Sequence, residues 1–138
     1  MTVVIDASVA LKWVLDEPGQ AAADGLLDEE LVAPSLWLIE AANALWRRSR
    51  RGEISNQEAR DRLVALRSAP VATSEGADDL LDAADLAAQL DHPVYDCLYL
   101  AVALREDAWV VTADERFLAA VARSQTLAGR VRLLGSEA

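Results

Sequence analysis

Short apolar runs alternate with longer segments of helical spacing along the whole chain. Runs rich in valine, isoleucine, leucine or threonine predict strands at Thr2 to Ile5, Leu31 to Ala33, Val71 to Thr73, Ala108 to Thr112 and Val131 to Leu133. Most of these runs are separated by helices of ten or more residues, which implies right-handed crossovers between parallel strands. The pattern therefore predicts an α/β sandwich, a parallel sheet with helices on both faces.

The segments between the predicted strands have the spacing and the end signals of helices. Predicted helices cover Ala7 to Leu15, the stretch after Gly19 through Glu29, Ser35 to about Gly52, Ser55 to Ser68, Ala77 to Leu90, Val94 to Leu104 and Glu115 to Arg123. Ser55 and Glu58 have the spacing of a capping box, and Pro70 follows the end of that helix. With no linker, repeat or low-complexity segment, residues 1–138 are expected to form one domain.

Length and composition indicate the number of domains and the expected cellular location of the protein. The chain has 138 residues, which suits a single core, and it has no apolar run of the roughly 18 residues that a membrane span needs. Cys97 is the only cysteine and lies in an apolar helix, so it is expected to be a core residue without a disulfide. We therefore expect a cytoplasmic protein with no membrane partner.

The net charge of −10 opposes binding to nucleic acid, because phosphate backbones are bound largely through lysine and arginine. The local distribution of charge matters more than its sum. Arg47, Arg48, Arg50 and Arg51 form the densest basic cluster and are the candidate RNA-binding residues. The alternative is that these arginines only complement the dipole at the end of their helix.

Two candidate acids follow predicted strands directly. Asp6 follows the first strand and Asp114 follows the strand that ends at Thr112. In open parallel sheets, binding sites form outside the carboxyl ends of the strands. The alternative for both residues is structural, because aspartate is also a preferred N-cap of a following helix.

Two further acids lie on predicted helices with apolar surroundings. Asp96 is the one charged residue between Val94 and Leu104, and burying an unpaired carboxylate is costly, so a cation is expected beside it. Glu40 also lies among apolar residues, although it shares a helical stripe with Asn43 and Arg47 that can be a solvated face. For Asp96 the alternative is hydrogen bonding to free N–H groups at the helix start.

Four carboxylates at one end of a sheet raise one another's pKa unless a divalent cation holds them ionised. Their oxygen ligands select Mg²⁺ or Mn²⁺, and Mg²⁺ usually takes only one or two direct carboxylates and keeps several waters. Ser8 and Thr112, each two residues from a key aspartate, can hydrogen-bond a carboxylate or a bound water, or cap a helix or turn. His92 precedes Pro93 and is expected to be a surface histidine in a loop.

Four motifs together resemble the PIN-domain family, in particular toxins of the VapC type. They are Val3 to Ser8 (VVIDAS), Glu40 to Leu45 (EAANAL), Tyr95 to Ala101 (YDCLYLA) and Val111 to Phe117 (VTADERF), in the family's order and across nearly the whole chain. The resemblance implies a three-layer α/β/α sandwich with a central parallel sheet of four or five strands. It also implies a Mg²⁺- or Mn²⁺-dependent endoribonuclease that acts as the toxin of a type II toxin–antitoxin system.

The resemblance assigns roles to particular residues and partners. Matched by motif, the catalytic and metal-binding residues are Asp6, Glu40, Asp96 and Asp114, and the residues that support them are Ser8, Asn43 and Thr112. The implied partners are an RNA substrate, a homodimeric second copy, and a cognate antitoxin whose basic segment enters the acidic pocket.

Two rival functions are weighed against this one. A phosphoacceptor receiver domain needs adjacent acids after the first strand and a late lysine, whereas Asp6 stands alone and Lys12 is the only lysine. A PIN-like module that binds partners without catalysis is the stronger rival, and Mn²⁺ binding separates it from the nuclease. The RNA target and its cleavage sequence are not specified by these residues.

Overall fold

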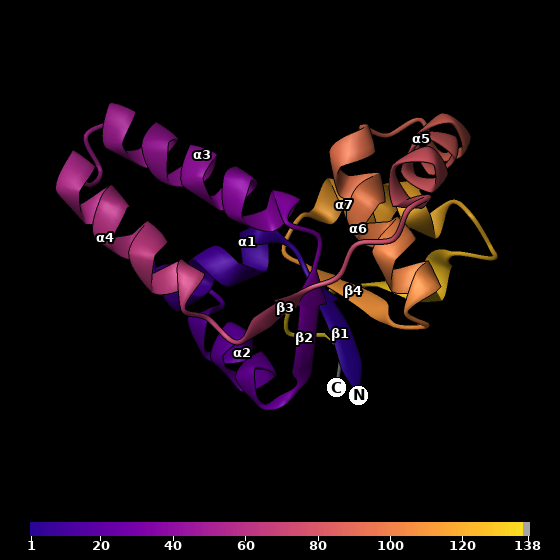
Figure 1. Ribbon diagram of the computed structural model, residues 1–138, viewed down its shortest axis with the longest axis horizontal. Coiled ribbons are helices and arrows are strands. Elements are labelled where there is room, and N and C mark those ends of the chain that lie inside the picture. The colour runs from indigo at the N-terminus through magenta and orange to yellow at the C-terminus, as the bar shows by residue number, and fades with distance from the viewer. Residues whose placement is uncertain (137–138) are drawn as a thin grey trace.

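A central sheet of five parallel strands organises the protein, whose computed structural model describes residues 1–136 (Figure 1). The strands are β1 (Thr2–Ile5), β2 (Glu30–Ala33), β3 (Val71–Thr73), β4 (Trp109–Thr112) and β5 (Val131–Leu133). Their order across the sheet is β3-β2-β1-β4-β5, and every neighbouring pair is parallel. The predicted parallel sheet is confirmed, and it has five strands.

Helices connect the strands and lie on both sides of the sheet. They are α1 (Ala7–Ala10), α2 (Gln20–Gly25), α3 (Leu36–Arg50), α4 (Asn56–Arg67), α5 (Asp79–Leu90), α6 (Val94–Arg105) and α7 (Glu115–Ala122), with 3₁₀ turns η1 (Leu11–Trp13), η2 (Leu26–Asp28) and η3 (Ala128–Arg130). In Figure 1, α1 to α4 lie on one side of the central strands and α5 to α7 on the other. The three-layer α/β/α arrangement is therefore confirmed.

The core forms where β1 and β4 pack against α6. The side chains of Val4, Ile5, Val110 and Val111 are fully buried on these strands, and much of α6 is buried as well. Strands covered on both faces need continuous apolar runs, which is the pattern seen in the sequence. Within residues 1–136, the helices are too short or too polar to cross a lipid bilayer.

Two predicted helices are shorter in the structure. The helix predicted after Gly19 through Glu29 is α2 followed by the 3₁₀ turn η2. The segment predicted as one helix from Ala7 to Leu15 is a four-residue helix followed by the 3₁₀ turn η1. The turn tightens because the Trp13 indole N–H donates to the carbonyl of Ala23 (2.8 Å), which draws this segment onto α2. The predicted capping box is confirmed, since the Ser55 hydroxyl and the Glu58 carboxylate each accept the other residue's backbone N–H at 3.0 Å.

An ion pair between the buried Asp79 and the partly exposed Arg105 joins the start of α5 to the end of α6. Arg105 donates two hydrogen bonds to the Asp79 carboxylate, at 2.8 and 2.9 Å, and the Gly76 N–H donates a third at 2.7 Å. A Cβ atom at Gly76 would approach Arg105 Nε to 2.5 Å, so the backbone at this position must be glycine for the pair to close. The hydrogen-bonded Arg105 holds the pKa of Asp79 below its usual range.

Candidate active site

The adjacency of β1 and β4 brings the two strand-end aspartates together. Ile5 pairs with Val111, so Asp6 and Thr112 follow the paired residues on neighbouring parallel strands. Asp6 is the N-cap of α1, where its carboxylate accepts the Val9 N–H, and Asp114 is the N-cap of α7. The capping role foreseen for both residues is therefore real, and it coexists with their position at the site.

All four predicted acids line one cleft of about 230 Å³. Glu40 comes from α3 and Asp96 from the first turn of α6, while Asp6 and Asp114 come from the strand ends. Ser8 and Arg47 also line the cleft. The sequence placed these residues on four separate segments, and the fold brings them to one hollow at the carboxyl edge of the sheet.

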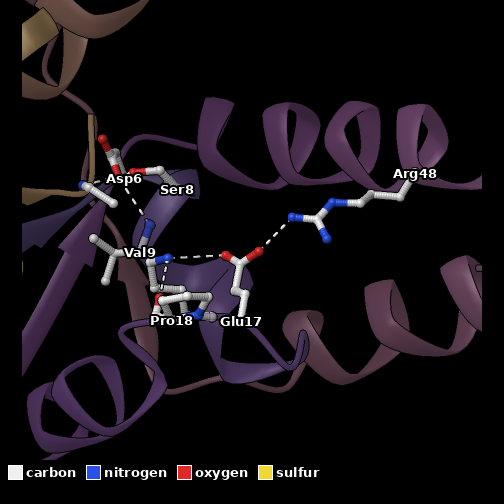
Figure 2. A network of polar contacts seen from close by, with 8 residues as sticks. Asp6, Ser8, Val9, Glu17, Pro18 and Arg48 are labelled. Atoms are coloured by element: carbon white, nitrogen blue, oxygen red, sulfur yellow. Dashed lines mark hydrogen bonds and ion pairs between the residues drawn. The ribbon is translucent and has the colours of Figure 1, made fainter. Parts of the chain in front are cut away.

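Asp6 is the buried acid of the cleft, with 5% of its surface exposed. Its two carboxylate oxygens accept hydrogen bonds from the hydroxyls of Ser8 (2.6 Å) and Thr112 (2.5 Å). Figure 2 shows Asp6 facing Ser8 and the backbone of Val9. Burial raises the pKa of Asp6 to about 6, because the neutral donors offset only part of the desolvation.

Ser8 and Thr112 also tie the two strand ends together. The Ser8 hydroxyl accepts the Ala113 N–H, and the Thr112 hydroxyl accepts the Asp114 N–H, both at 3.0 Å. Each hydroxyl thus donates to Asp6 and accepts from the backbone that leads to Asp114. Both geometries are those expected of residues that support the acids.

Glu40 is positioned by a residue that the sequence analysis did not single out. The hydroxyl of Tyr99, which is fully buried on α6, donates to Glu40 Oε1 at 2.6 Å. Burial raises the pKa of Glu40, and burial beside Glu40 raises the pKa of Tyr99 far above its usual range. Tyr99 is therefore a permanent hydrogen-bond donor that leaves Glu40 Oε2 available to the cleft.

Asp96 is held by His92, which lies in a loop as predicted but is largely covered and not a surface residue. The His92 ring lies on Phe117 with 5.4 Å between ring centroids, and its side chain is only 13% exposed. His92 Nε2 lies 2.7 Å from Asp96 Oδ2. The side chain beside Asp96 is thus a histidine four positions earlier, a spacing visible in the sequence.

The charge of Asp96 reaches the other acids. Burial is the main cause of the raised pKa of Asp6 and Glu40, and the charge of Asp96 raises both further, while hydrogen bonds lower them in part. Repulsion of this kind is relieved by a cation among the carboxylates. The electrostatics of the cleft therefore agree with the expectation from the sequence.

The donor set fits a hydrated divalent cation better than a fully coordinated one. Within residues 1–136, no three Asp, Glu, His or Cys side chains are close enough together to hold a metal ion directly. Carboxylate oxygens keep lone pairs after accepting one hydrogen bond, and Mg²⁺ binds commonly through one or two carboxylates plus waters. Asp6, Glu40, Asp96 and Asp114 have the chemistry for that mode of binding.

Three of the four arginines in the predicted RNA-binding cluster already have partners in the structure. Arg47 lines the cleft, whereas Arg48 reaches Glu17 at 2.5 Å, a contact that Figure 2 shows crossing from α3 to the loop before α2. Arg50 lies over the Trp46 ring at 5.5 Å, and Arg51 pairs with Glu53 at 2.9 Å. Only the Arg48–Glu17 pair joins segments far apart in the sequence, whereas the contacts of Arg50 and Arg51 are with residues two to four positions away.

Asn43 and Cys97 are the two remaining residues for which the sequence predicts a position. Asn43 is exposed on α3 and is not among the residues that line the cleft. Cys97 is fully buried, as predicted, and burial raises the pKa of its thiol to about 11. A thiol of that pKa is a poor nucleophile at neutral pH.

Comparisons with known proteins agree with this geometry. A protein-family model described as the PIN domain matches residues 3–123. The crystal structure of PAE2754 from Pyrobaculum aerophilum is similar with a TM-score of 0.74 and 24% identity, over 97% of this chain and 90% of that one. VapBC2 from Rickettsia felis, bound to a DNA fragment from their promoter, is similar with a TM-score of 0.67 and 15% identity, over 96% of this chain and 98% of that one. No curated protein matches the sequence.

Proposed function

The chain belongs to the PIN domain family, and from this premise we propose that it is a metal-dependent endoribonuclease, the toxin of a toxin–antitoxin pair. PIN domains are generally nucleases, and such nucleases generally use divalent metal ions. The observation that carries the proposal is the convergence of four acids from four segments on one cleft. We propose that residues 1–138 act as one nuclease domain.

In this proposal the four acids share the work of the cleft. Asp6, Glu40, Asp96 and Asp114 would hold Mg²⁺ or Mn²⁺, which supplies a lowered pKa for a bound water and neutralises charge on the phosphate. Glu40 Oε2, which Tyr99 leaves free, orients the attacking water and accepts its proton, as its raised pKa favours. In-line attack on the phosphodiester leaves 5′-phosphate and 3′-hydroxyl ends.

The positions of Ser8, Thr112 and His92 support the acids in this role. Ser8 and Thr112 orient both oxygens of Asp6, and His92 orients Asp96 through Oδ2. A site held by fixed hydrogen bonds needs little rearrangement when substrate binds, which is a general source of catalytic rate. None of the three residues has to contact RNA itself.

We further propose the partners and setting that the family suggests. VapBC2 from Rickettsia felis, which has a similar fold, was solved bound to a DNA fragment from their promoter, and the VapC-type resemblance suggests an antitoxin partner for this chain. A cognate antitoxin with a basic segment suits the acidic cleft and the net charge of −10. The proposal includes a homodimer and a cytoplasmic location.

Cleavage of labelled RNA in Mg²⁺ or Mn²⁺ tests the nuclease function. We expect cleavage to stop with EDTA, and Asp96→Asn to lower kcat by on the order of 10²–10³. Asp85→Asn, at an exposed position of α5, is the matched control and keeps full activity. Equal cleavage with EDTA present, or by the Asp96→Asn variant, would refute the proposal.

The alternative is a PIN-like module that binds partners without catalysis. It is favoured by the absence, among residues 1–136, of a ready cluster of three metal-ligating side chains. Calorimetric titration with Mn²⁺ separates the two functions. The nuclease requires a heat of binding that Asp6→Asn abolishes, and the module requires none.

A further inference from the structure

A second hollow adjoins the acidic cleft. It has a volume of about 290 Å³ and is lined by His92, Pro93, Asp96, Asp114 and Arg116. Asp96 and Asp114 also line the acidic cleft, so these two carboxylates form the boundary between the hollows. The second hollow has no role in the function proposed above.

Each hollow has one arginine, and the two arginines share an unusual state. Arg47 lines the acidic cleft and Arg116 lines the adjoining hollow. Within residues 1–136, neither guanidinium forms an ion pair, a hydrogen bond or a stacking contact with a ring. Both are therefore free to bind a ligand without first breaking a contact.

Most other arginines of the chain are already engaged. Their partners are acidic side chains, aromatic rings or backbone carbonyls for Arg48, Arg50, Arg51, Arg62, Arg105, Arg123, Arg130 and Arg132. Only Arg60 and Arg67, both on α4, share the unpaired state of Arg47 and Arg116 within the described residues. Neither of them is among the residues that line the two hollows.

The two free cations lie on opposite sides of the acids. Arg47 is on α3 and Arg116 is in the first turn of α7, and Figure 1 shows these helices on opposite sides of the central strands. A polyanion that crosses the carboxylates needs positive charge on both sides to offset the repulsion. Guanidinium binds phosphate through two parallel N–H donors, a geometry that lysine lacks.

We propose that the adjoining hollow is a binding subsite for the phosphate next to the one that is cleaved, with Arg116 as its ligand. The RNA strand then runs from Arg47, over the acids, to Arg116. This inference rests on the proposed function, since it names how the same site holds its substrate. It replaces the four-arginine surface expected from the sequence with a pair of arginines from two helices.

Binding of a short, fluorescein-labelled, single-stranded RNA of mixed sequence tests the subsite. Anisotropy is measured in EDTA and again in Ca²⁺, between about 50 and about 200 mM salt. We expect Arg116→Ala to weaken binding roughly tenfold and to reduce the slope of log K against log salt by about 0.7, the value for one phosphate contact on a single strand. Arg116→Lys keeps the slope.

Matched variants make the result specific. Arg60→Ala and Arg67→Ala also remove an unpaired, exposed arginine, and we expect each to leave the affinity within about twofold. The double variant Arg47→Ala/Arg116→Ala should lose about 1.4 from the slope, because the two residues contact separate phosphates. Thermal unfolding should be unchanged in all of them, since none of these side chains has a hydrogen-bond, ion-pair or aromatic partner among residues 1–136.

The outcome is separable from that of the proposed function. If Arg116→Ala binds RNA like Arg60→Ala, the subsite is refuted even when cleavage needs metal and Asp96. If cleavage proves independent of metal and Asp96 while Arg116→Ala still flattens the salt slope, the nuclease site is refuted and the phosphate subsite stands.

Discussion

The protein buries two aspartates to nearly the same extent and treats them in opposite ways. Asp6 is 5% exposed and Asp79 is 6% exposed. Asp79 has a guanidinium partner in Arg105, whereas Asp6 has only hydroxyl and N–H donors. The pKa of Asp79 is lowered by its partner, and burial raises the pKa of Asp6 to about 6.

This difference in partners indicates a structural role for Asp79 and a cation-binding role for Asp6. The charge of Asp79 is balanced within the protein by Arg105, and this ion pair joins α5 to α6. A buried acid with neutral donors alone is oriented but electrostatically incomplete, so it attracts a cation from solution. Burial by itself therefore does not identify a functional acid, and the charge of its partners does.

Exchange of each aspartate for asparagine should separate chemistry from stability most strongly. We expect Asp6→Asn to lower the rate of RNA cleavage by on the order of 10²–10³ or more, with little loss of stability, because asparagine also caps a helix. Asp79→Asn should cost about 2 kcal/mol of unfolding free energy and leave kcat of the folded protein unchanged. Urea unfolding and single-turnover cleavage measure the two effects, and loss of kcat in a folded Asp79→Asn protein would contradict the comparison.

The two aspartates should also give opposite pH dependences of stability in metal-free protein. The pKa of Asp6 is about 6 in the folded state against an ordinary 3.8, so folded protein binds the extra proton in that window. Unfolding free energy should then fall by up to about 3 kcal/mol as pH rises from about 4 to about 6. Asp6→Asn should remove this fall, and Mg²⁺ should reduce it.

Asp79 should give the opposite pH dependence of stability, at pH values below those at which Asp6 titrates. Because its folded pKa is lowered, its contribution to stability is complete above the ordinary value and is lost as pH falls through the folded pKa. Asp79→Asn should therefore flatten the acid side of the profile alone. Urea titrations in EDTA at several pH values measure both, and identical profiles for wild type and Asp6→Asn would count against the assignment.

Removal of Arg105 should cost about as much stability as the Asp79→Asn exchange. Arg105→Ala leaves the Asp79 carboxylate buried without its partner, which typically costs 3–5 kcal/mol when both groups are fully buried. Because the Arg105 side chain is 33% exposed, we expect about 2 kcal/mol in urea unfolding. The apolar double variant Asp79→Leu/Arg105→Met should recover most of this loss, and a failure to recover would show that the pair does more than fasten two helices.

The fold was largely predictable because its strands are covered on both faces. Continuous apolar runs and clear helix ends placed all five strands and the main helices close to their observed bounds. The exception was the segment after Asp6, where a contact from Trp13 to a residue ten positions later replaces a helical turn with a tighter one. Local spacing does not report contacts of that kind.

The acids of the site were predictable for a related reason, and their partners were not. Asp96 stands out in its sequence because every neighbour is apolar, and strand ends mark Asp6 and Asp114. Tyr99 reaches Glu40 across 59 positions and Arg48 reaches Glu17 across 31, so neither pairing has a local signal. The His92–Asp96 contact did have a local signal, because the two residues are only four positions apart.

Two of the four acids are also the N-cap residues of helices. Asp6 receives the Val9 N–H, and Asp114 Oδ1 receives the Arg116 N–H at 2.9 Å. Asparagine performs this duty about as well as aspartate, and a single base change converts one codon to the other. Loss of catalysis at these positions therefore need not cost the protein its shape. A variant with asparagine at these positions would therefore keep the outer surface of the folded protein while losing two of the carboxylates that line the cleft.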